Sequence, residues 1–554
     1  MITGTAWVPH GFAAEFPVKY ELDESELERI SELSRLNLND ANEDLEEAMA
    51  GSDDEHAGAE SDAESAGDDA AATAGTGAGN RAGPDLSALK NTEDADDDLR
   101  EYNLDSYDEP TGEQAGVFSN INSLAYYKSN DEDPYIVLPE GERDDLEEEE
   151  REELQILHSD SILLVTKTEE NMSTMEVYVY EEAESNLYVH HDLMLPAFPL
   201  CVEWLNYRVG PTRAKEGDTG NFAAIGTFDP DIEIWNLDVV DGMYPDAILG
   251  NTRGESALEA EPVETDKKKK KKKKSKKPAE PVANDKYHVG PVLALAGNRL
   301  HKNLLASGSA DKTIKLWDLS TLSCARSYTF HTDKVSALNW HPTEGPVLLS
   351  GAYDRTIVAS DMRAPDTAVR RWGVEADING VRWDVHDPNF FYVATESGRV
   401  HYFDARTAPA SLADSKPVWT LQAHDDEVSS FDINPTVPGF LATGSPDREV
   451  KLWKVTKGRP SLVASRNLDV GKVYSVAWAP DRDTGLTLAV GGSKSVVQVW
   501  DTKTNANVRR ALEADLAGLK DVISASTTDK VVGVARDDSE DEFEDADDDE
   551  DMDD

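Results

Sequence analysis

The sequence predicts an all-β protein, a propeller of seven four-stranded blades that carries disordered acidic and lysine-rich inserts and an acidic tail. Two short sequence phrases alternate along the chain, and each has the pattern of a half-buried strand. The second phrase recurs every 43 to 50 residues, apart from one gap of 82. A repeat of this length with several short strands is typical of propeller blades.

The two phrases differ in how they end. The first is an apolar strand that closes on tryptophan, at Trp7, Trp204, Trp340, Trp383 and Trp478. The second is an alternating strand that ends on an aromatic residue, at Trp235, Trp317, Phe403, Trp453 and Trp500, with Ser360 in the one repeat that lacks the aromatic. These phrases are the signature of WD repeats, so the predicted fold is a seven-bladed WD40 β-propeller.

One more blade is needed before Trp235. We assign it the strands 2–7, 161–166 and 175–180, with a long acidic segment inserted between the first two. The gap of 82 residues is then one repeat plus the lysine-rich insert. The expected order along the chain is the first strand of blade one (1–20), an acidic disordered insert (21–120), the rest of blade one and blade two (121–249), a lysine-rich disordered insert (250–286), blades three to seven (287–510) and a C-terminal extension with the acidic tail (511–554).

Most of the net charge of −56 lies in two segments, 21–160 and 537–554. From Glu21 to about Asn120 the first segment is dominated by Asp, Glu, Ala, Gly and Ser, and the second segment is an acidic tail of mostly Asp and Glu. The stretch 21–120 cannot bury enough apolar surface to offset the conformational entropy lost on ordering, so it is expected to be disordered. Within the first, Glu24–Leu38 has leucine and isoleucine at helical spacing. This pattern predicts either a docking amphipathic helix or a marginal helix in an acidic linker.

A lysine tract lies in the second insert, between Asp266 and Pro278. Its charges repel one another, so the tract is expected to be extended and exposed. Such tracts act as nuclear import signals or nucleic-acid patches, and a solvated loop without a partner is the alternative. We interpret it as an import signal formed by Lys267, Lys268, Lys269, Lys270, Lys271, Lys272, Lys273, Lys274, Lys276 and Lys277.

Polar residues also recur at matched positions of the repeats. In WD repeats a His, a Ser or Thr, an Asp and a Trp can form a buried hydrogen-bonded chain. Blades three and six carry the complete set: His288, Ser307, Asp311 and Trp317, and His424, Thr443, Asp447 and Trp453. Blade four has His331, Ser350 and Asp354, but Ser360 replaces the tryptophan. Repetition at the same offsets favours a structural role over catalysis.

Several classes of protein are excluded by what the sequence lacks. Cys201 and Cys324 lie far apart and form no metal-binding or disulfide pattern. The N-terminus has no secretory signal, and no apolar run approaches the roughly 20 residues that span a bilayer. We find no nucleophile motif, metal spacing or phosphate-binding glycine loop. We therefore expect a soluble intracellular protein that is not an enzyme and has no cofactor, membrane contact or small-molecule substrate.

The whole arrangement resembles the periodic tryptophan protein 1 family of nucleolar WD-repeat proteins. The resemblance rests on the opening Trp7-Val-Pro strand, the two inserts and the acidic tail. It implies a nucleolar, and hence nuclear, assembly factor for the large ribosomal subunit that is needed for pre-rRNA processing. The implied partners are ribosome assembly factors, ribosomal proteins and, directly or indirectly, pre-rRNA. Animal members also suggest a link to chromatin and rRNA-gene transcription, which adds histones as candidate partners.

Two other functions remain open at this stage. The acidic segments also suit a histone- or chromatin-binding scaffold. The segments Ser360-Asp-Met-Arg363 and Phe403-Asp-Ala-Arg406 resemble the Trp-Asp-x-Arg boxes of cullin ubiquitin-ligase substrate receptors, although the first residue differs. Arg363 and Arg406 would then contact an adaptor; alternatively they pair with neighbouring aspartates. Finally, Ser52, Ser61 and Ser539 precede acidic residues, which makes them candidate phosphorylation sites.

Overall fold

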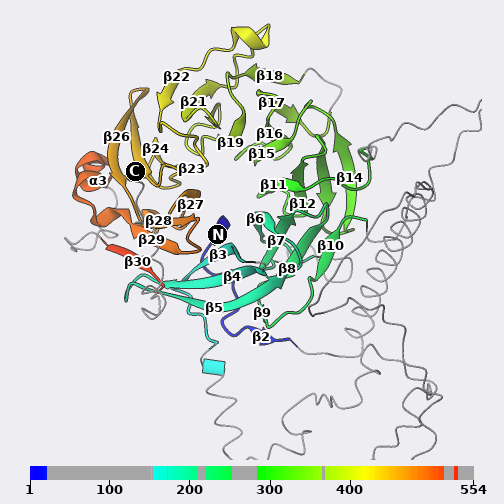
Figure 1. Ribbon diagram of the computed structural model, residues 1–554, viewed down its shortest axis with the longest axis vertical. Helices are drawn as coiled ribbons and strands as arrows, with labels where there is room; N and C mark the ends of the chain where they lie inside the picture. The colour runs from blue at the N-terminus through cyan, green and yellow to red at the C-terminus, as the bar shows by residue number, and fades with distance from the viewer. Residues whose placement is uncertain are drawn as a thin grey trace, which may run out of the picture. The chain divides into compact units, whose positions relative to one another are not determined.

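The computed structural model describes residues 1–20, 151–152, 154–170, 172–209, 219–251, 283–364, 369–516 and 530–534. These residues form seven four-stranded antiparallel sheets, arranged as the blades of a ring (Figure 1). The arrangement confirms the predicted seven-bladed propeller. The predicted helix Glu24–Leu38, the lysine tract, Ser52, Ser61, Ser539 and the acidic tail all lie outside the described residues.

Each blade uses four strands in chain order, and the first of them lies nearest the centre of the ring (Figure 1). Blades one to three are β1 (Ile2–Val8), β3 (Ser161–Glu169), β4 (Met172–Glu181) and β5 (Asn186–Leu195); β6 (Pro199–Leu205), β7 (Phe222–Thr227), β8 (Ile232–Asn236) and β10 (Ala247–Leu249); and β11 (Val292–Gly297), β12 (Leu304–Ser309), β13 (Ile314–Asp318) and β14 (Ser323–Tyr328). Blades four and five are β15 (Val335–Trp340), β16 (Val347–Ala352), β17 (Thr356–Asp361) and β18 (Arg370–Gly373); and β19 (Ile378–Trp383), β20 (Phe390–Thr395), β21 (Arg399–Asp404) and β22 (Trp419–Gln422). Blades six and seven are β23 (Ser430–Ile433), β24 (Phe440–Gly444), β25 (Val450–Thr456) and β26 (Arg459–Arg466); and β27 (Val473–Trp478), β28 (Thr487–Gly492), β29 (Val497–Asp501) and β30 (Lys530–Gly533).

The remaining elements are short. A parallel pair, β2 (Val18–Lys19) with β9 (Val239–Val240), ties the end of the first segment to blade two. The helical turns are η4 (Leu412–Asp414), η5 (Thr502–Thr504), α3 (Ala506–Ala511) and α4 (Glu513–Leu516). None of the helices in the described ranges has the length and apolar character required to cross a membrane.

Neighbouring blades pack closely at a glycine in the second strand of one blade and are joined by a hydrogen bond from a tryptophan in the first strand of the next. A Cβ atom on Gly308 of β12 would lie 2.7 Å from Val335 Cγ1 of blade four, a distance that only glycine permits. At the same junction, the indole N–H of Trp340 donates to Ala296 O of blade three at 2.9 Å. The regular spacing of the repeats within this sequence therefore places glycine and tryptophan where two blades meet.

The ring closes between blades one and seven. A Cβ on Gly491 of β28 would lie 2.6 Å from Ile2 Cγ2. Ile2 of β1 therefore packs against Gly491 in the same way as Val335 packs against Gly308. Trp7 Nε1–H donates to Ala477 O at 3.0 Å, and the Thr5 N–H donates to Ser475 Oγ at 3.1 Å. Among the described residues no strand is exchanged between these two blades, so side-chain packing and a few hydrogen bonds close the ring.

The end of blade seven differs from the expected boundary. Its outermost strand is β30, which pairs with β29 through Trp500–Val531 and neighbouring positions. The blade therefore extends beyond residue 510, into the segment that the sequence analysis treated as an extension. The strand was missed because Lys530–Gly533 is short, only half-buried and lacks either tryptophan phrase.

A buried carboxyl in blade two makes stability depend on pH. Glu233 is buried, accepts a hydrogen bond from Trp235 Nε1 at 3.0 Å, and burial raises its pKa from 4.5 to about 7. The folded state therefore binds this proton more tightly than the unfolded state, and stability falls as pH rises from about 4.5 to about 7. Glu233→Gln keeps the acceptor but cannot ionise, so it should stabilise the protein by up to about 3 kcal/mol at pH 8.

The stabilisation by Glu233→Gln should be smaller at pH 6 than at pH 8, as measured by thermal denaturation at both pH values. Glu396→Gln provides the control, because Glu396 is exposed. A gain from Glu233→Gln that is equal at the two pH values would contradict the assignment.

Candidate functional site at the junction of blades four and five

The structure brings together the polar residues predicted in blades three and six. In blade three, His288 Nδ1 lies 2.9 Å from Asp311 Oδ2, and His288 Nε2 lies 2.7 Å from Ser307 Oγ. Trp317 Nε1–H donates to the same Ser307 oxygen at 2.8 Å. The equivalent distances in blade six are 2.7 Å for His424–Asp447, 2.9 Å for His424–Thr443 and 3.0 Å for Trp453–Thr443. In each blade the hydrogen bonds link four residues in order. They run from the tryptophan of the third strand to the hydroxyl of the second strand, then to the histidine before the first strand, and finally to the aspartate of the turn after the second strand.

The electrostatics of these chains explain why they serve structure. Burial lowers the pKa of both His288 and His424, so the imidazoles are neutral. Burial raises the pKa of Asp311, but hydrogen bonds from His288 and Thr313 outweigh it and hold that pKa well below its usual range. His288 and Ser307 are 1% and 0% exposed. The groups satisfy one another, and the histidine, hydroxyl and tryptophan members are buried in both blades, so they stabilise the blade.

Blade four forms only part of this chain. His331 Nε2 lies 2.8 Å from Ser350 Oγ, and His331 Nδ1 lies 3.3 Å from Asp354 Oδ2. Ser360 occupies the tryptophan position, so Ser350 Oγ receives no indole hydrogen bond, although it still donates to Val358 O at 3.4 Å as Thr443 of blade six does to Lys451 O. Blade four therefore keeps the histidine but loses the aromatic end of the chain.

Blade five lacks this hydrogen-bonded set of four residues. At the same offsets it carries Val374, Val393, Ser397 and Phe403. Beside these positions lies an ionic cluster, in which Glu375 Oε1 is 3.0 Å from Arg399 Nη1 and 3.1 Å from His401 Nε2. His401 Nδ1 in turn lies 3.0 Å from Thr420 Oγ1. A different polar network thus occupies the side of blade five that faces blade four.

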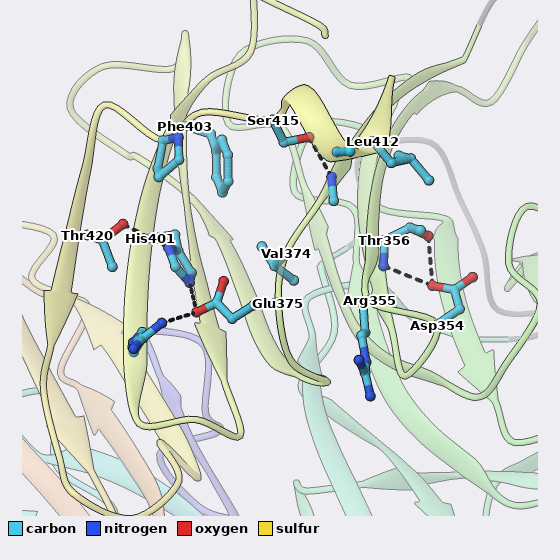
Figure 2. A pocket seen from close by; sticks show the side chains of 14 residues that line it. Asp354, Arg355, Thr356, Val374, Glu375, His401, Phe403, Leu412, Ser415 and Thr420 are labelled. Carbon is cyan, nitrogen blue, oxygen red and sulfur yellow. Dashed lines mark hydrogen bonds and ion pairs between the residues drawn. The ribbon is translucent and has the colours of Figure 1, made fainter. Parts of the chain in front are cut away.

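These side chains line a cleft of about 550 Å³ between the two blades. Figure 2 shows His401 and Thr420 on one side, Arg355 and Thr356 on the other, and the η4 loop above them. The loop is held to blade four because the Gly373 N–H donates to Ser415 Oγ at 2.8 Å. The longer repeat of blade five therefore supplies a loop that covers the edge strand β18.

The cleft is polar, and its histidine and glutamate have pKa values that keep the imidazole neutral and the carboxylate ionised. Burial lowers the pKa of His401 and leaves it neutral. Burial raises the pKa of Glu375, but its own backbone N–H and the adjacent His401 and Arg399 outweigh this and lower it. Within the described part of the chain, no group of His, Cys, Asp and Glu side chains could hold a metal ion. The arrangement can bind a polar partner, but it offers no activated nucleophile.

A second cavity, of about 420 Å³, lies at the same junction. Its walls include Ala359, Ser360 and Asp361 of β17, Arg370 of β18, Trp383 of β19 and Arg406 after β21. We name it the Ala359 cavity. The corresponding position before the end of the third strand is larger in the other blades that carry the second phrase: Ile234, Leu316, Tyr402, Leu452 and Val499. Alanine at this position leaves the space empty.

Arg363 and Arg406 each pair with the aspartate two residues before them. Arg363 Nη2 lies 2.8 Å from Asp361 Oδ2, and Arg406 Nη2 lies 2.8 Å from Asp404 Oδ2. Both arginine side chains are exposed, at 74% and 61%. The structure thus contains the pairing that the sequence analysis considered as the alternative to an adaptor contact.

The sequence analysis missed both the cleft and the Ala359 cavity. The signal was present in the repeat offsets, since Val374 and Phe403 interrupt the polar pattern of blade five and Ala359 is small where the other blades carry a larger residue. The two irregular blades are adjacent, so their departures meet at one junction. This junction is the best candidate for a functional site among the described residues.

Comparisons with known proteins identify the family. A family model described as WD domain, G-beta repeat matches residues 280–318, 322–358 and 415–454. An uncharacterized WD repeat-containing protein of Schizosaccharomyces pombe is 44% identical over 93% of this chain and 91% of its own length. Periodic tryptophan protein 1 of Saccharomyces cerevisiae is 39% identical over 94% of this chain and 91% of its own length, and its Drosophila melanogaster homologue is 29% identical over 92% and 95%. The chain therefore belongs to the periodic tryptophan protein 1 family.

Proposed function

We propose that this chain is a non-catalytic scaffold that acts in the nucleolus on precursors of the large ribosomal subunit and supports pre-rRNA processing. The observation that carries the proposal is the similarity to periodic tryptophan protein 1 along nearly the whole chain. The family resemblance implies the ribosomal role, and the WD-repeat propeller itself implies binding to other proteins.

The distribution of charge supports this type of partner. Acidic segments attract basic proteins such as ribosomal proteins, and a lysine tract attracts RNA phosphates. The histidine, hydroxyl and tryptophan groups of the polar sets in blades three and six are buried and hydrogen-bonded to one another, which suits a rigid platform. The chemistry of rRNA processing would then be carried out by other factors assembled on this platform.

Affinity purification of the tagged protein from nuclear extract, followed by gradient sedimentation, tests the proposal. We expect the protein to sediment with large-subunit pre-rRNA and assembly factors. A light complex with histones that survives nuclease but dissociates at high salt would favour a chromatin scaffold instead. A complex with a cullin adaptor would favour a substrate receptor, and either result would overturn the ribosomal role.

The lysine tract should direct the protein to the nucleus. We expect replacement of Lys267–Lys277 by a glycine-serine linker of equal length to reduce nuclear accumulation severalfold, because the import receptor loses its basic ligand. Quantitative fluorescence imaging of the tagged protein measures the change. Fusion of an unrelated import signal should restore accumulation, and removal of 537–554 serves as the control deletion. Normal nuclear accumulation of the linker variant would contradict the assignment.

A further inference from the structure

We propose that the Ala359 cavity is a docking pocket for a peptide segment of a partner protein, which inserts one aliphatic or aromatic side chain and places a carboxylate beside Arg370. The inference deepens the proposed scaffold function by identifying where a partner binds. It depends on three observations: the size of the cavity, an unpaired buried donor in its wall and the charges at its mouth.

The cavity exists because blade four lacks a large side chain that other blades possess. In blade three, Leu316 packs in one core cluster with Trp340 of the following blade. Ala359 takes the equivalent position beside Trp383 and fills much less space. The cavity is open at its mouth and is lined by both polar and apolar side chains. Its volume of about 420 Å³ is large enough for a leucine or phenylalanine side chain with part of its flanking backbone.

The wall of the cavity contains a donor without an acceptor. At the junction of blades three and four, the Trp340 indole N–H bonds to Ala296 O. Trp383 holds the same position in blade five and is only 4% exposed, yet its Nε1 has no hydrogen-bond partner among the described residues, a property it shares with Trp478 of blade seven. A buried unpaired donor costs about 1–3 kcal/mol. A backbone carbonyl of an inserted peptide would supply the acceptor.

The charges at the mouth favour a peptide over RNA. Asp361 and Asp404 neutralise Arg363 and Arg406, and the carboxylate of Glu344 also lines the cavity, which disfavours a polyanion. Arg370 is exposed and donates to Ala405 O at 2.8 Å, and no carboxylate lies within ion-pair distance of it in the described ranges. One open guanidinium suits a single carboxylate on a peptide. Binding to an RNA backbone relies on several cations that are free to neutralise successive phosphates.

The test fills the cavity with the residue that the protein itself uses elsewhere. Ala359→Leu restores the side chain found at Leu316 and Leu452. Binding is measured by fluorescence anisotropy with the full-length protein and short glycine-serine peptides that carry leucine or phenylalanine next to glutamate. We expect saturable binding that weakens about tenfold or more in Ala359→Leu, while the melting temperature stays equal or rises.

The charge is tested separately. Arg370→Glu should weaken binding of the glutamate peptides and favour peptides in which lysine replaces glutamate. Arg459→Glu is the matched control, because Arg459 is an exposed arginine on β26 of blade six, away from the cavity. If Ala359→Leu disturbs folding, Trp383→Phe removes the indole donor with a smaller change in volume and should weaken the same peptides severalfold.

Failure of all these peptides to bind, or binding that Ala359→Leu leaves unchanged, would overturn the docking pocket. Binding of single-stranded RNA that is lost in Ala359→Leu would also overturn it, since a base would then be the occupant. These results concern the purified protein, so they leave the ribosomal role standing. Conversely, the lack of pre-rRNA in the gradient experiment would overturn that role and leave the pocket standing.

Discussion

Replacing Trp317 by alanine should lower the free energy of unfolding by about 3 to 5 kcal/mol, the range for truncating a buried aromatic side chain. Trp317 is 1% exposed and packs between blades two and three. Its removal leaves a cavity and also takes the indole donor away from Ser307. Denaturant unfolding followed by circular dichroism measures the change through the transition midpoint.

Trp317→Phe separates the two effects, because it retains most of the volume and removes only the N–H group. We expect it to cost about 1 to 2 kcal/mol, close to the loss of one buried hydrogen bond. Blade four shows that the remaining polar chain can persist without the indole, as His331 and Ser350 still bond to each other. A cost for Trp317→Ala no greater than that of Trp317→Phe would contradict the structural role of the tryptophan.

Trp7→Ala should weaken the closure of the ring, at a similar cost of about 3 to 5 kcal/mol. Trp7 is 7% exposed and bonds across the closing junction to Ala477 O. Because packing and hydrogen bonds alone join blades one and seven among the described residues, we expect amide hydrogen exchange to rise in both β1 and β27. Exchange measured by mass spectrometry locates the opening.

Trp340→Ala is the matched control, since Trp340 makes the same indole bond at the junction of blades three and four. There the chain passes directly from β14 to β15, so loss of the tryptophan should raise exchange locally in β11 and β15. Faster exchange in β27 after Trp340→Ala, or unchanged exchange there after Trp7→Ala, would show that the ring is not closed in this way.

Local patterns were sufficient to predict the architecture. The spacing of the tryptophan phrases identified the blades, because each phrase reports which residues of a strand face the neighbouring blade. The polar chains of blades three and six could be named in advance for the same reason, since their members occur at constant offsets. The insertion of the acidic segment between β1 and β3 also followed from the repeat count.

Other features depend on contacts between residues far apart in the chain. Strand β30 is recognisable only through its pairing with β29, because four half-buried residues carry no periodic signal. Closure of the ring depends on how Ile2 and Trp7 meet blade seven. The Ala359 cavity arises because a small side chain in blade four faces Trp383 of blade five. The sequence by itself therefore determined the repeated unit, whereas the tertiary structure decided how the units close into a ring and where the packing between them is incomplete, since these depend on the fit of side chains from different repeats.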